Sequence, residues 1–201
     1  MYELFIKNNN PKDKQVLENK SLTENMDINI ETLFNECGGY SFRNGLYRIH
    51  NPTSSLHWAI LISSYFTKYK KIIPFGYDWM GRQFAIDMNR ANYILMFDPA
   101  TAEDFELKGS LASFHNQDLV HEREPLLAER LFNQVIMSLG IDDINYNDCA
   151  GYKVPLFLNG SETLDNYEIS NMEVYWEIQC QIYIQIKNLP PGTKIDSIKI
   201  K

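Results

Sequence analysis

Pro74-Phe-Gly-Tyr-Asp-Trp-Met-Gly-Arg-Gln-Phe-Ala-Ile-Asp87 is the stretch of this 201-residue chain that decides the fold. Large apolar side chains alternate with small or polar ones before and after Gly81, which is the period of a β-strand. Gly81 itself can adopt the positive φ that a tight turn requires. The stretch therefore predicts a hairpin of two strands, over residues 71–80 and 83–88, whose aromatic side chains belong to the core.

Further strands flank the hairpin in the sequence. They are predicted at residues 46–50, 93–97 and 105–107, with a short strand at 4–7 in the polar arm 1–26 and an edge strand at 194–201. The strands next to the hairpin are separated from it by short loops. Consecutive strands joined in this way form an antiparallel meander.

Helical periodicity occurs before and after the strands, and it dominates the second half of the chain. Helices are predicted at residues 28–37, 52–68, 111–121, 125–139 and 172–189, with a polar, acidic loop at 142–151. The last helical segment also alternates like a strand, but its length and its lack of Gly and Pro favour a helix. Strands that cluster before helices are typical of an α+β fold. We therefore expect one compact α+β unit over residues 1–201, with a sheet-rich half at 28–108 and a more helical half at 109–201.

The composition excludes several functional classes. The formal net charge is -7 and the pI is about 5.1, so the chain lacks the basic surface of a nucleic-acid-binding protein and suits a basic protein partner. No apolar run approaches the ~20 residues that cross a bilayer, and the N-terminus has no secretion signal. Cys37, Cys149 and Cys180 lack the spacing of a zinc site and fit reduced thiols. We expect a cytoplasmic protein that does not bind membranes.

The motifs in the sequence predict no cofactor and no metal. The glycines lack the spacing of phosphate-binding loops, and no Ser occupies a nucleophile elbow. The nearest approach to an acid–base or metal cluster is His115 with His121 and Glu122. On a helix of about 3.6 residues per turn the two histidines face different directions, unlike the i, i+4 pair of a zinc-binding helix. A helix start for His115 and a surface position for His121 are the simpler interpretation.

Asp78 and the three tryptophans have a structural and a functional interpretation. Asp78 lies between two aromatic residues of the hairpin, so its side chain is expected to point away from them and to cap the turn or pair with Arg82. Trp58, Trp79 and Trp176 can form a platform for a ligand, but at these spacings tryptophans are more often core residues with a satisfied indole N–H. We expect core roles for all three.

The hairpin and several later motifs resemble a family of bacterial immunity proteins. The motifs are Phe97-Asp-Pro-Ala-Thr101, Ser110-Leu-Ala-Ser-Phe-His-Asn116, Gly151-Tyr-Lys-Val-Pro-Leu-Phe-Leu-Asn-Gly160, Asn166-Tyr-Glu168 and Met172-Glu-Val-Tyr-Trp176. The chain resembles the GAD-related group with a C-terminal half of unknown function, which is associated with type VI secretion DNase-immunity proteins and lies near the SUKH-like superfamily. Its structural residues here are Phe75, Gly76, Asp78, Trp79, Gly81, Phe114, Tyr152, Pro155 and Trp176. Asn159 stands where the family pattern has a glycine, and Asn also tolerates a left-handed turn.

The resemblance implies a function and a set of candidate residues. Members of such families bind a cognate toxin, often a nuclease, in the cytoplasm and neutralise it without catalysis. A nuclease presents basic groups to phosphates, and an acidic inhibitor can cover that surface. The candidate partner-binding residues are therefore Asp142, Asp143 and Asp148, with Glu162, Asp165 and Glu168, in a run that continues to Glu173 and Glu177. No oligomeric state is predicted.

Two other hypotheses stay open at the level of the sequence. In the first, the same fold carries a small-ligand or general protein-interaction module whose pocket is lined by Tyr and Trp residues. Binding that depends on Trp79 and Trp176, rather than on the acidic loops, would favour it. In the second, the chain is an enzyme that uses His115, His121 and Glu122, and stoichiometric metal would favour that hypothesis.

Overall fold

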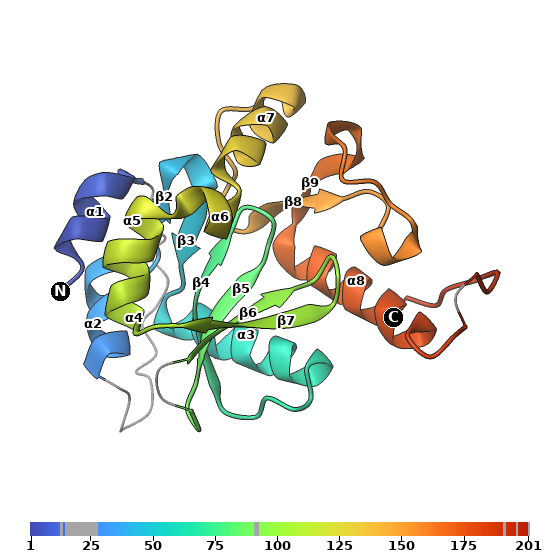
Figure 1. The fold of residues 1–201 in the computed structure, drawn as a ribbon, viewed down its shortest axis with the longest axis horizontal. Helices are drawn as coiled ribbons and strands as arrows, with labels where there is room; N and C mark the ends of the chain where they lie inside the picture. Colours follow the sequence, from blue (N-terminus) through green and yellow to red (C-terminus); the bar gives the residue numbers. More distant parts are fainter. Residues whose placement is uncertain (13, 15–27, 91–92, 191, 196, 201) are drawn as a thin grey trace.

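The computed structural model describes residues 1–12, 14, 28–90, 93–190, 192–195 and 197–200 (Figure 1). Within these residues the chain forms a seven-stranded antiparallel sheet, a separate two-stranded sheet and helices on both faces of the larger sheet. The strands of the large sheet lie in chain order, so each pairs with the strand before it. This arrangement confirms the predicted α+β class and the antiparallel meander.

The predicted hairpin lies at the centre of the large sheet. The strands of that sheet are β1 Pro11–Lys12, β2 Ser41–Phe42, β3 Tyr47–Ile49, β4 Ile72–Asp78, β5 Gln83–Asp87, β6 Tyr93–Asp98 and β7 Glu103–Lys108. β4 and β5 form the hairpin, and Gly81 in their turn has a φ of 80°. A β-bulge between Pro74 and Gly76 shifts the register, so Tyr77 belongs to a different apolar cluster from Phe75.

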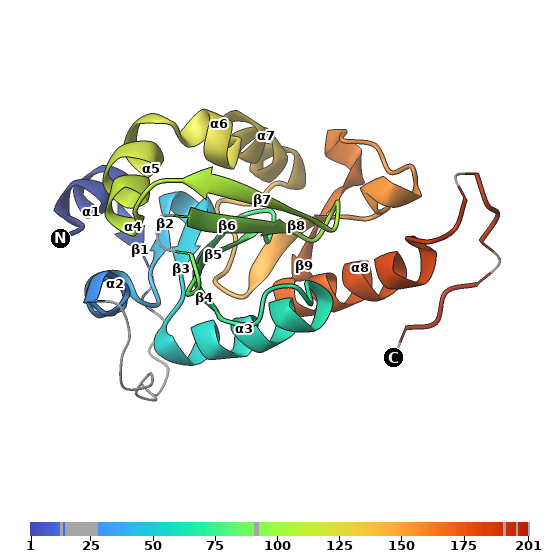
Figure 2. The ribbon, with the colours of Figure 1, turned by 60° about the horizontal axis from the view of Figure 1, so that its bottom comes forward.

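Helices enclose the sheet from two sides (Figure 2). They are α1 Glu3–Asn9, α2 Ile28–Cys37, α3 Pro52–Tyr65, α4 Leu111–Ser113, α5 Leu119–His121, α6 Arg123–Leu127, α7 Glu129–Leu139 and α8 Met172–Ile186, with a π-helical turn at Phe114–Asp118. α3 and α8 lie on one side of the sheet, and α1 and α4 to α7 lie on the other. Because strand side chains alternate between faces, Phe75 and Phe84 pack in the cluster of α1 and α7, whereas Ala85 and Leu95 pack in that of α3 and α8.

Two tryptophans fasten the hairpin turn to helices on opposite sides of the sheet. The indole N–H of Trp79 donates to the Leu127 carbonyl at 2.7 Å, and that of Trp176 donates to the Gly81 carbonyl at 2.6 Å. Both side chains are fully buried. Each indole therefore buries a large apolar area while its single donor is satisfied, which confirms the predicted core roles.

Asp78 has both of its predicted roles in the hairpin turn. Its carboxylate accepts hydrogen bonds from the main-chain N–H groups of Met80 and Arg82, each at 3.0 Å. It also pairs with the Arg82 guanidinium, whose Nε lies 2.6 Å away. The Arg82 guanidinium donates in turn to the Leu126 carbonyl at 2.9 Å, so the turn is joined to α6 by a charged pair as well as by Trp79.

Two terminal predictions are wrong. Residues 4–7 lie in α1 and not in a strand, and the burial of Phe5 and Asn9, four residues apart, is the spacing of a helix. The edge strand predicted at 194–201 is absent from residues 194–195 and 197–200, and the remainder of that prediction lies outside the described residues. Most of the predicted arm beyond residue 12 also lies outside them.

The predicted helix at 125–139 is two helices. Ala128 has a left-handed φ of 51° at the junction of α6 and α7. The break releases the carbonyl of Leu127 from helical pairing, and this carbonyl accepts the Trp79 indole N–H. The helix predicted at 172–189 is confirmed as α8, which ends three residues earlier at Ile186.

The loop predicted at 142–151 is only partly a loop. Its last four residues belong to β8 Asp148–Tyr152, which pairs with β9 Tyr167–Asn171. Cys149, Ala150 and Gly151 are buried in β8, and such small residues do not mark a strand in the sequence. The Ala150 N–H donates to the Trp79 carbonyl at 2.8 Å, which joins the small sheet to the central hairpin.

Candidate protein-binding site

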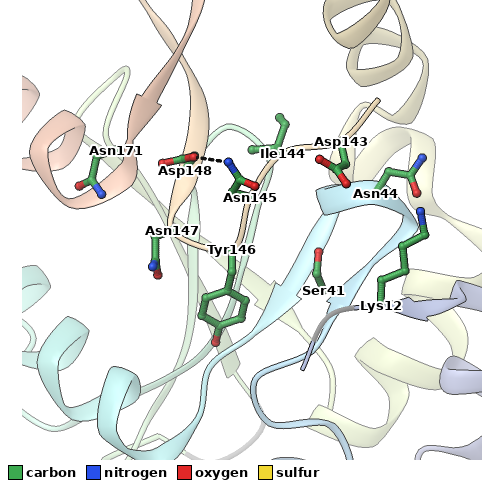
Figure 3. A pocket seen from close by; sticks show the side chains of 10 residues that line it. All are labelled: Lys12, Ser41, Asn44, Asp143, Ile144, Asn145, Tyr146, Asn147, Asp148 and Asn171. Carbon is green, nitrogen blue, oxygen red and sulfur yellow. Dashed lines mark hydrogen bonds between the residues drawn. The ribbon is translucent and has the colours of Figure 1, made fainter. Parts of the chain in front are cut away.

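A polar groove of about 400 Å³ opens beside the start of β8 (Figure 3). It is lined by Lys12 in β1, Ser41 in β2 and Asn44 in the turn between β2 and β3, and by Asp143, Ile144, Asn145, Tyr146, Asn147, Asp148 and Asn171 from the second half of the chain. Four of these residues are asparagines, and we name the feature the asparagine groove. It contains two of the predicted partner-binding residues, Asp143 and Asp148.

Arg48 in β3 holds the backbone of the groove in place. This residue is fully buried, and its guanidinium donates to the main-chain carbonyls of Asn145 at 2.7 Å, Asp148 at 2.5 Å and Asp78 at 3.0 Å. It also lies 4.8 Å from the centre of the Tyr77 ring. Carbonyl dipoles and an aromatic face thus compensate the buried charge, and the cation fixes the main chain on which the groove residues are carried.

Two buried tyrosines provide a second attachment of the same loop. The Tyr77 hydroxyl donates to the Tyr146 carbonyl at 2.7 Å, and the Tyr146 hydroxyl donates to the Ile49 carbonyl at 2.8 Å. Burial raises the pKa of both hydroxyls, so both remain protonated donors at neutral pH. The loop is therefore tied to β3 and β4 by its main chain and by a side chain.

The opposite rim has an unusual backbone. Arg43, Asn44 and Gly45 have consecutive positive φ values of 50°, 59° and 90°, and such a conformation costs on the order of 1–3 kcal/mol for each non-glycine residue. Arg43 is held by a 2.7 Å ion pair with Glu129, and the Asn44 carbonyl accepts the Ile144 N–H at 3.1 Å. A Cβ added at Gly45 would lie 2.5 Å from the Ile144 carbonyl oxygen, so glycine permits the two rims to meet.

Most hydrogen-bonding groups of the four asparagines are available to a ligand. The Asn145 amide donates to the Asp148 carboxylate at 2.9 Å, and the Asn171 side-chain oxygen caps α8 by accepting a main-chain N–H at 3.2 Å. Within the described part of the chain, the side-chain amides of Asn44 and Asn147 have no hydrogen-bond partner. The groove therefore presents both donors and acceptors.

The other predicted acidic residues lie on the small sheet and its connection. Glu168 is in β9, and Glu162 and Asp165 are in the segment that joins β8 to β9. All three are exposed. A hydrogen bond from the Thr163 hydroxyl lowers the pKa of Asp165 and keeps it ionised. Because β8 begins with Asp148, the pairing of β8 with β9 connects both predicted acidic groups through one structural unit.

The negative charge of the chain is concentrated in this unit. Residues 141–173, from the end of α7 to the first turn of α8, hold seven acidic residues and one basic residue, Lys153. Their formal charge is -6, so the other 168 residues contribute only -1 to the chain's -7. We name residues 141–173 the acidic segment. A surface formed mainly by such a segment has a negative potential.

Apolar side chains are interspersed with the charges of the acidic segment. Val154, Leu164 and Ile169 are 48%, 39% and 38% exposed, and Val174 just beyond the segment is 52% exposed. Single exposed aliphatic residues are common. Their presence among exposed carboxylates gives the segment the mixture of apolar contact and charged rim that is found at protein–protein interfaces.

The structure does not assemble the histidine cluster. His115 is fully buried in the π-helical turn rather than at a helix start, with Nδ1 2.8 Å from the Leu111 carbonyl and Nε2 3.2 Å from the Tyr47 hydroxyl. Desolvation lowers the pKa of His115 to about 4. His121 and Glu122 are exposed. Across the described residues no group of three or more His, Cys, Asp or Glu side chains is arranged to hold a metal ion.

The residues that carry the family resemblance are interior residues. All nine are buried: Phe75, Gly76, Asp78, Trp79, Gly81, Phe114, Tyr152, Pro155 and Trp176. Trp79 and Trp176 are fully buried and line none of the described pockets. Asn159 has a φ of 64°, as expected for an asparagine at a left-handed turn. These residues stabilise the fold, so a surface that binds a partner must be formed by other residues.

The amide residues of the groove are the functional candidates that sequence reasoning missed. They are Asn44, Asn145, Asn147 and Asn171, together with Lys12 and Ser41. A signal was present in residues 143–147, where exposed polar residues alternate with the buried Ile144 and Tyr146. An alternation of period two inside an acidic loop indicates a segment with one face packed against the core and the other exposed to solvent.

Comparisons with known proteins identify the fold and no family. No family model matches the chain, and no curated protein matches it. Among solved structures, the chain is similar to the crystal structure of Atu4351 from Agrobacterium tumefaciens, with a TM-score of 0.55 and 13% sequence identity over 90% of this chain and 89% of that one. At this identity the likeness concerns the fold alone. None of the described helices is long and apolar enough to span a membrane.

Proposed function

We propose that this chain is a cytoplasmic immunity protein that binds a secreted toxin with a basic contact surface and neutralises it by direct contact, without catalysis. The acidic segment is the observation that carries the proposal, because it holds a formal charge of -6 out of -7 in 33 consecutive residues. The resemblance of the hairpin and the later motifs to GAD-related immunity proteins supports the same function.

The physical basis is electrostatic complementarity. A nuclease toxin needs basic groups to contact phosphates, and a localised negative surface steers such a partner into an encounter complex. Arg48 and the pairing of β8 with β9 hold the acidic segment in a defined conformation. A surface that is ordered before binding loses less conformational entropy on association.

Charge neutralisation tests the proposal. The first variant combines Asp142→Asn, Glu162→Gln and Glu168→Gln in the acidic segment, and the matched control combines Glu3→Gln, Glu31→Gln and Glu122→Gln at exposed positions elsewhere. We expect the first variant to bind its cognate toxin, to be sought among the products of the neighbouring genes, about tenfold more slowly at low salt. The difference should shrink at high salt, because screening weakens interactions between exposed charges.

Association rates can be measured by surface plasmon resonance, and protection by the growth of cells that express the toxin. The control variant should associate and protect like the unaltered chain. An equal loss in both variants would contradict a role for the acidic segment. The absence of a complex with the toxin at both salt concentrations would contradict the immunity function itself.

A small polar ligand in the asparagine groove is a second candidate function. The volume of about 400 Å³ lies within the range of about 300–1,000 Å³ typical of ligand pockets. The free amides and carboxylates of its lining suit a hydroxylated or cationic molecule. Retention of such a molecule by both charge variants, with no toxin complex, would favour this alternative.

A further inference from the structure

We propose that the asparagine groove receives an extended, basic segment of the toxin and holds it through the main chain of that segment. The inference rests on the proposed function, because it takes the toxin as the partner and specifies how one part of it is recognised. It adds a neutral, hydrogen-bonding mode of recognition to the electrostatic attraction of the acidic segment.

The chemistry of the lining favours a polypeptide main chain. A side-chain amide has one carbonyl acceptor and an NH₂ donor, which complement the N–H and C=O of a peptide group. Asn44 and Asn147 offer both kinds of group without an internal partner among the described residues. Asn145 uses one of its two N–H donors on Asp148 and retains its acceptor, whereas Asn171 uses its oxygen on α8 and retains its donors.

The arrangement of the lining suits an extended occupant. Figure 3 shows Asn171, Asp148, Asn145, Asp143 and Asn44 in a row along the groove. Donors lie at the two ends of the row, on Asn171 and Asn44, and acceptors lie between them. An extended chain can reach both ends, because it advances about 3.3 Å per residue and exposes a donor and an acceptor at each peptide group. A compact small molecule would engage only part of the row.

The carboxylates select a basic sequence. Asp143 and Asp148 lie within the row, and one oxygen of Asp148 remains available beside its bond to Asn145. Lys12 lies at the Asn44 end of the groove and weakens the attraction of Asp143 for a cation. The preference for a Lys or Arg side chain therefore belongs mainly to the Asp148 end.

The groove is rigid enough to act in this way. Arg48 fixes the main chain of Asn145 and Asp148, and the Asn44 carbonyl binds the Ile144 N–H across the rims. The left-handed backbone at Asn44 is strained but is held by its neighbours. Because the main chain that carries the amides is positioned before binding, little backbone entropy is lost when a segment enters.

The test uses overlapping 15-residue peptides that cover the cognate toxin found among the products of the neighbouring genes, together with the intact toxin. Asn44→Gly and Asn147→Ala together remove two free amides, and glycine tolerates the left-handed φ at position 44. Asn35→Ala with Asn133→Ala is the matched control on exposed helical positions. We expect one basic peptide to bind and compete with the toxin. The groove variant should bind it about tenfold more weakly, equally at low and high salt, because the lost hydrogen bonds are neutral.

Methylation of main-chain nitrogens in that peptide should weaken binding more than replacement of its neutral side chains by alanine. Binding of the intact toxin to the groove variant with unaltered affinity would overturn the inference and leave the immunity function intact. Equal effects of main-chain methylation in the groove variant and the unaltered chain would also overturn it. Failure of the unaltered chain to bind the toxin would overturn the proposed function and this inference together.

Discussion

Arg48 is the residue on which the geometry of the groove most directly depends. Its guanidinium joins β3 to the partly buried carbonyls of Asn145 and Asp148 and to the buried carbonyl of Asp78, and its removal would take this donor from all three. Each unsatisfied buried group costs about 1–3 kcal/mol. We therefore expect Arg48→Met to lower the free energy of unfolding by about 3–5 kcal/mol, measured by urea denaturation.

Arg130→Met is the matched control for this substitution. The Arg130 side chain is 83% exposed and pairs with Glu124 at the surface, so its loss should change the free energy of unfolding by about 0.5 kcal/mol or less. Equal stability of the two variants would show that the hydrogen bonds of Arg48 do not stabilise the fold.

The role of Arg48 could not be predicted from the sequence. Its acceptors in the loop lie 97 to 100 residues further along the chain, and they are main-chain carbonyls that any residue type would provide. By contrast, the role of Asp78 was predictable because Arg82 and the turn N–H groups lie within four residues. Interactions between residues that are close in the sequence can be predicted from it, whereas contacts between residues that only the fold brings together cannot.

At the scale of elements, periodicity was informative where side chains are large. The alternation around Gly81 predicted β4 and β5, and helical spacing predicted α2 and α8. β8 was missed because its buried residues are small and its pairing partner β9 lies beyond a long connection. The split at Ala128 was missed because alanine is a strong helix former, and here tertiary contacts at Leu127 override that propensity.

Gly151 shows why β8 requires a small residue. A Cβ added there would lie 2.5 Å from Cε2 of the Tyr175 ring, which packs against the strand from α8. Gly151→Ala should therefore destabilise the protein by about 1–3 kcal/mol through overpacking, measured by urea denaturation. Because β8 carries one rim of the asparagine groove, the same variant should also weaken toxin binding.

Replacement of Tyr175 by a smaller residue tests whether steric overlap with its ring causes this loss of stability. Gly151→Ala combined with Tyr175→Leu should cost less than the sum of the two single substitutions, since the smaller side chain relieves the clash. Gly140→Asn is the control, because no atom lies within 4 Å of a Cβ at Gly140 and asparagine tolerates its left-handed φ of 67°. Additive effects in the double variant would exclude steric overlap as the reason.

At the scale of the whole molecule, the sequence was sufficient to identify the acidic residues but not the surface that they form in the folded protein. The acidic candidates Asp142, Asp143 and Asp148 were identified as one group, and those after residue 160 as another. Only the pairing of β8 with β9 makes them one unit. The asparagine groove was not predictable, because Asn44 and Asn171 are separated by more than half of the chain and meet only in the folded protein.

Two buried histidines, one in each apolar region, make the stability of the whole fold sensitive to acid. His115 is enclosed by Tyr47 and neighbouring rings, and His50 lies 2.8 Å from the Gln83 side chain and close to Tyr77. Desolvation lowers the pKa of His50 to about 3 and that of His115 to about 4. In the unfolded chain both return to a pKa of about 6.5.

Above pH of about 6.5 neither state binds these protons, and the contribution of the two histidines to stability is constant. Between about 6.5 and 4 the unfolded chain binds two protons that the folded chain does not, so stability falls by about 1.4 kcal/mol per histidine per pH unit. We expect the free energy of unfolding to fall by about 3 kcal/mol from pH 6.5 to 5, measured by urea denaturation at each pH. His121→Gln, at an exposed position, should leave this slope unchanged, whereas His115→Gln should roughly halve it. A flat profile over this range would mean that the buried imidazoles take up protons in the folded state as readily as in the unfolded one.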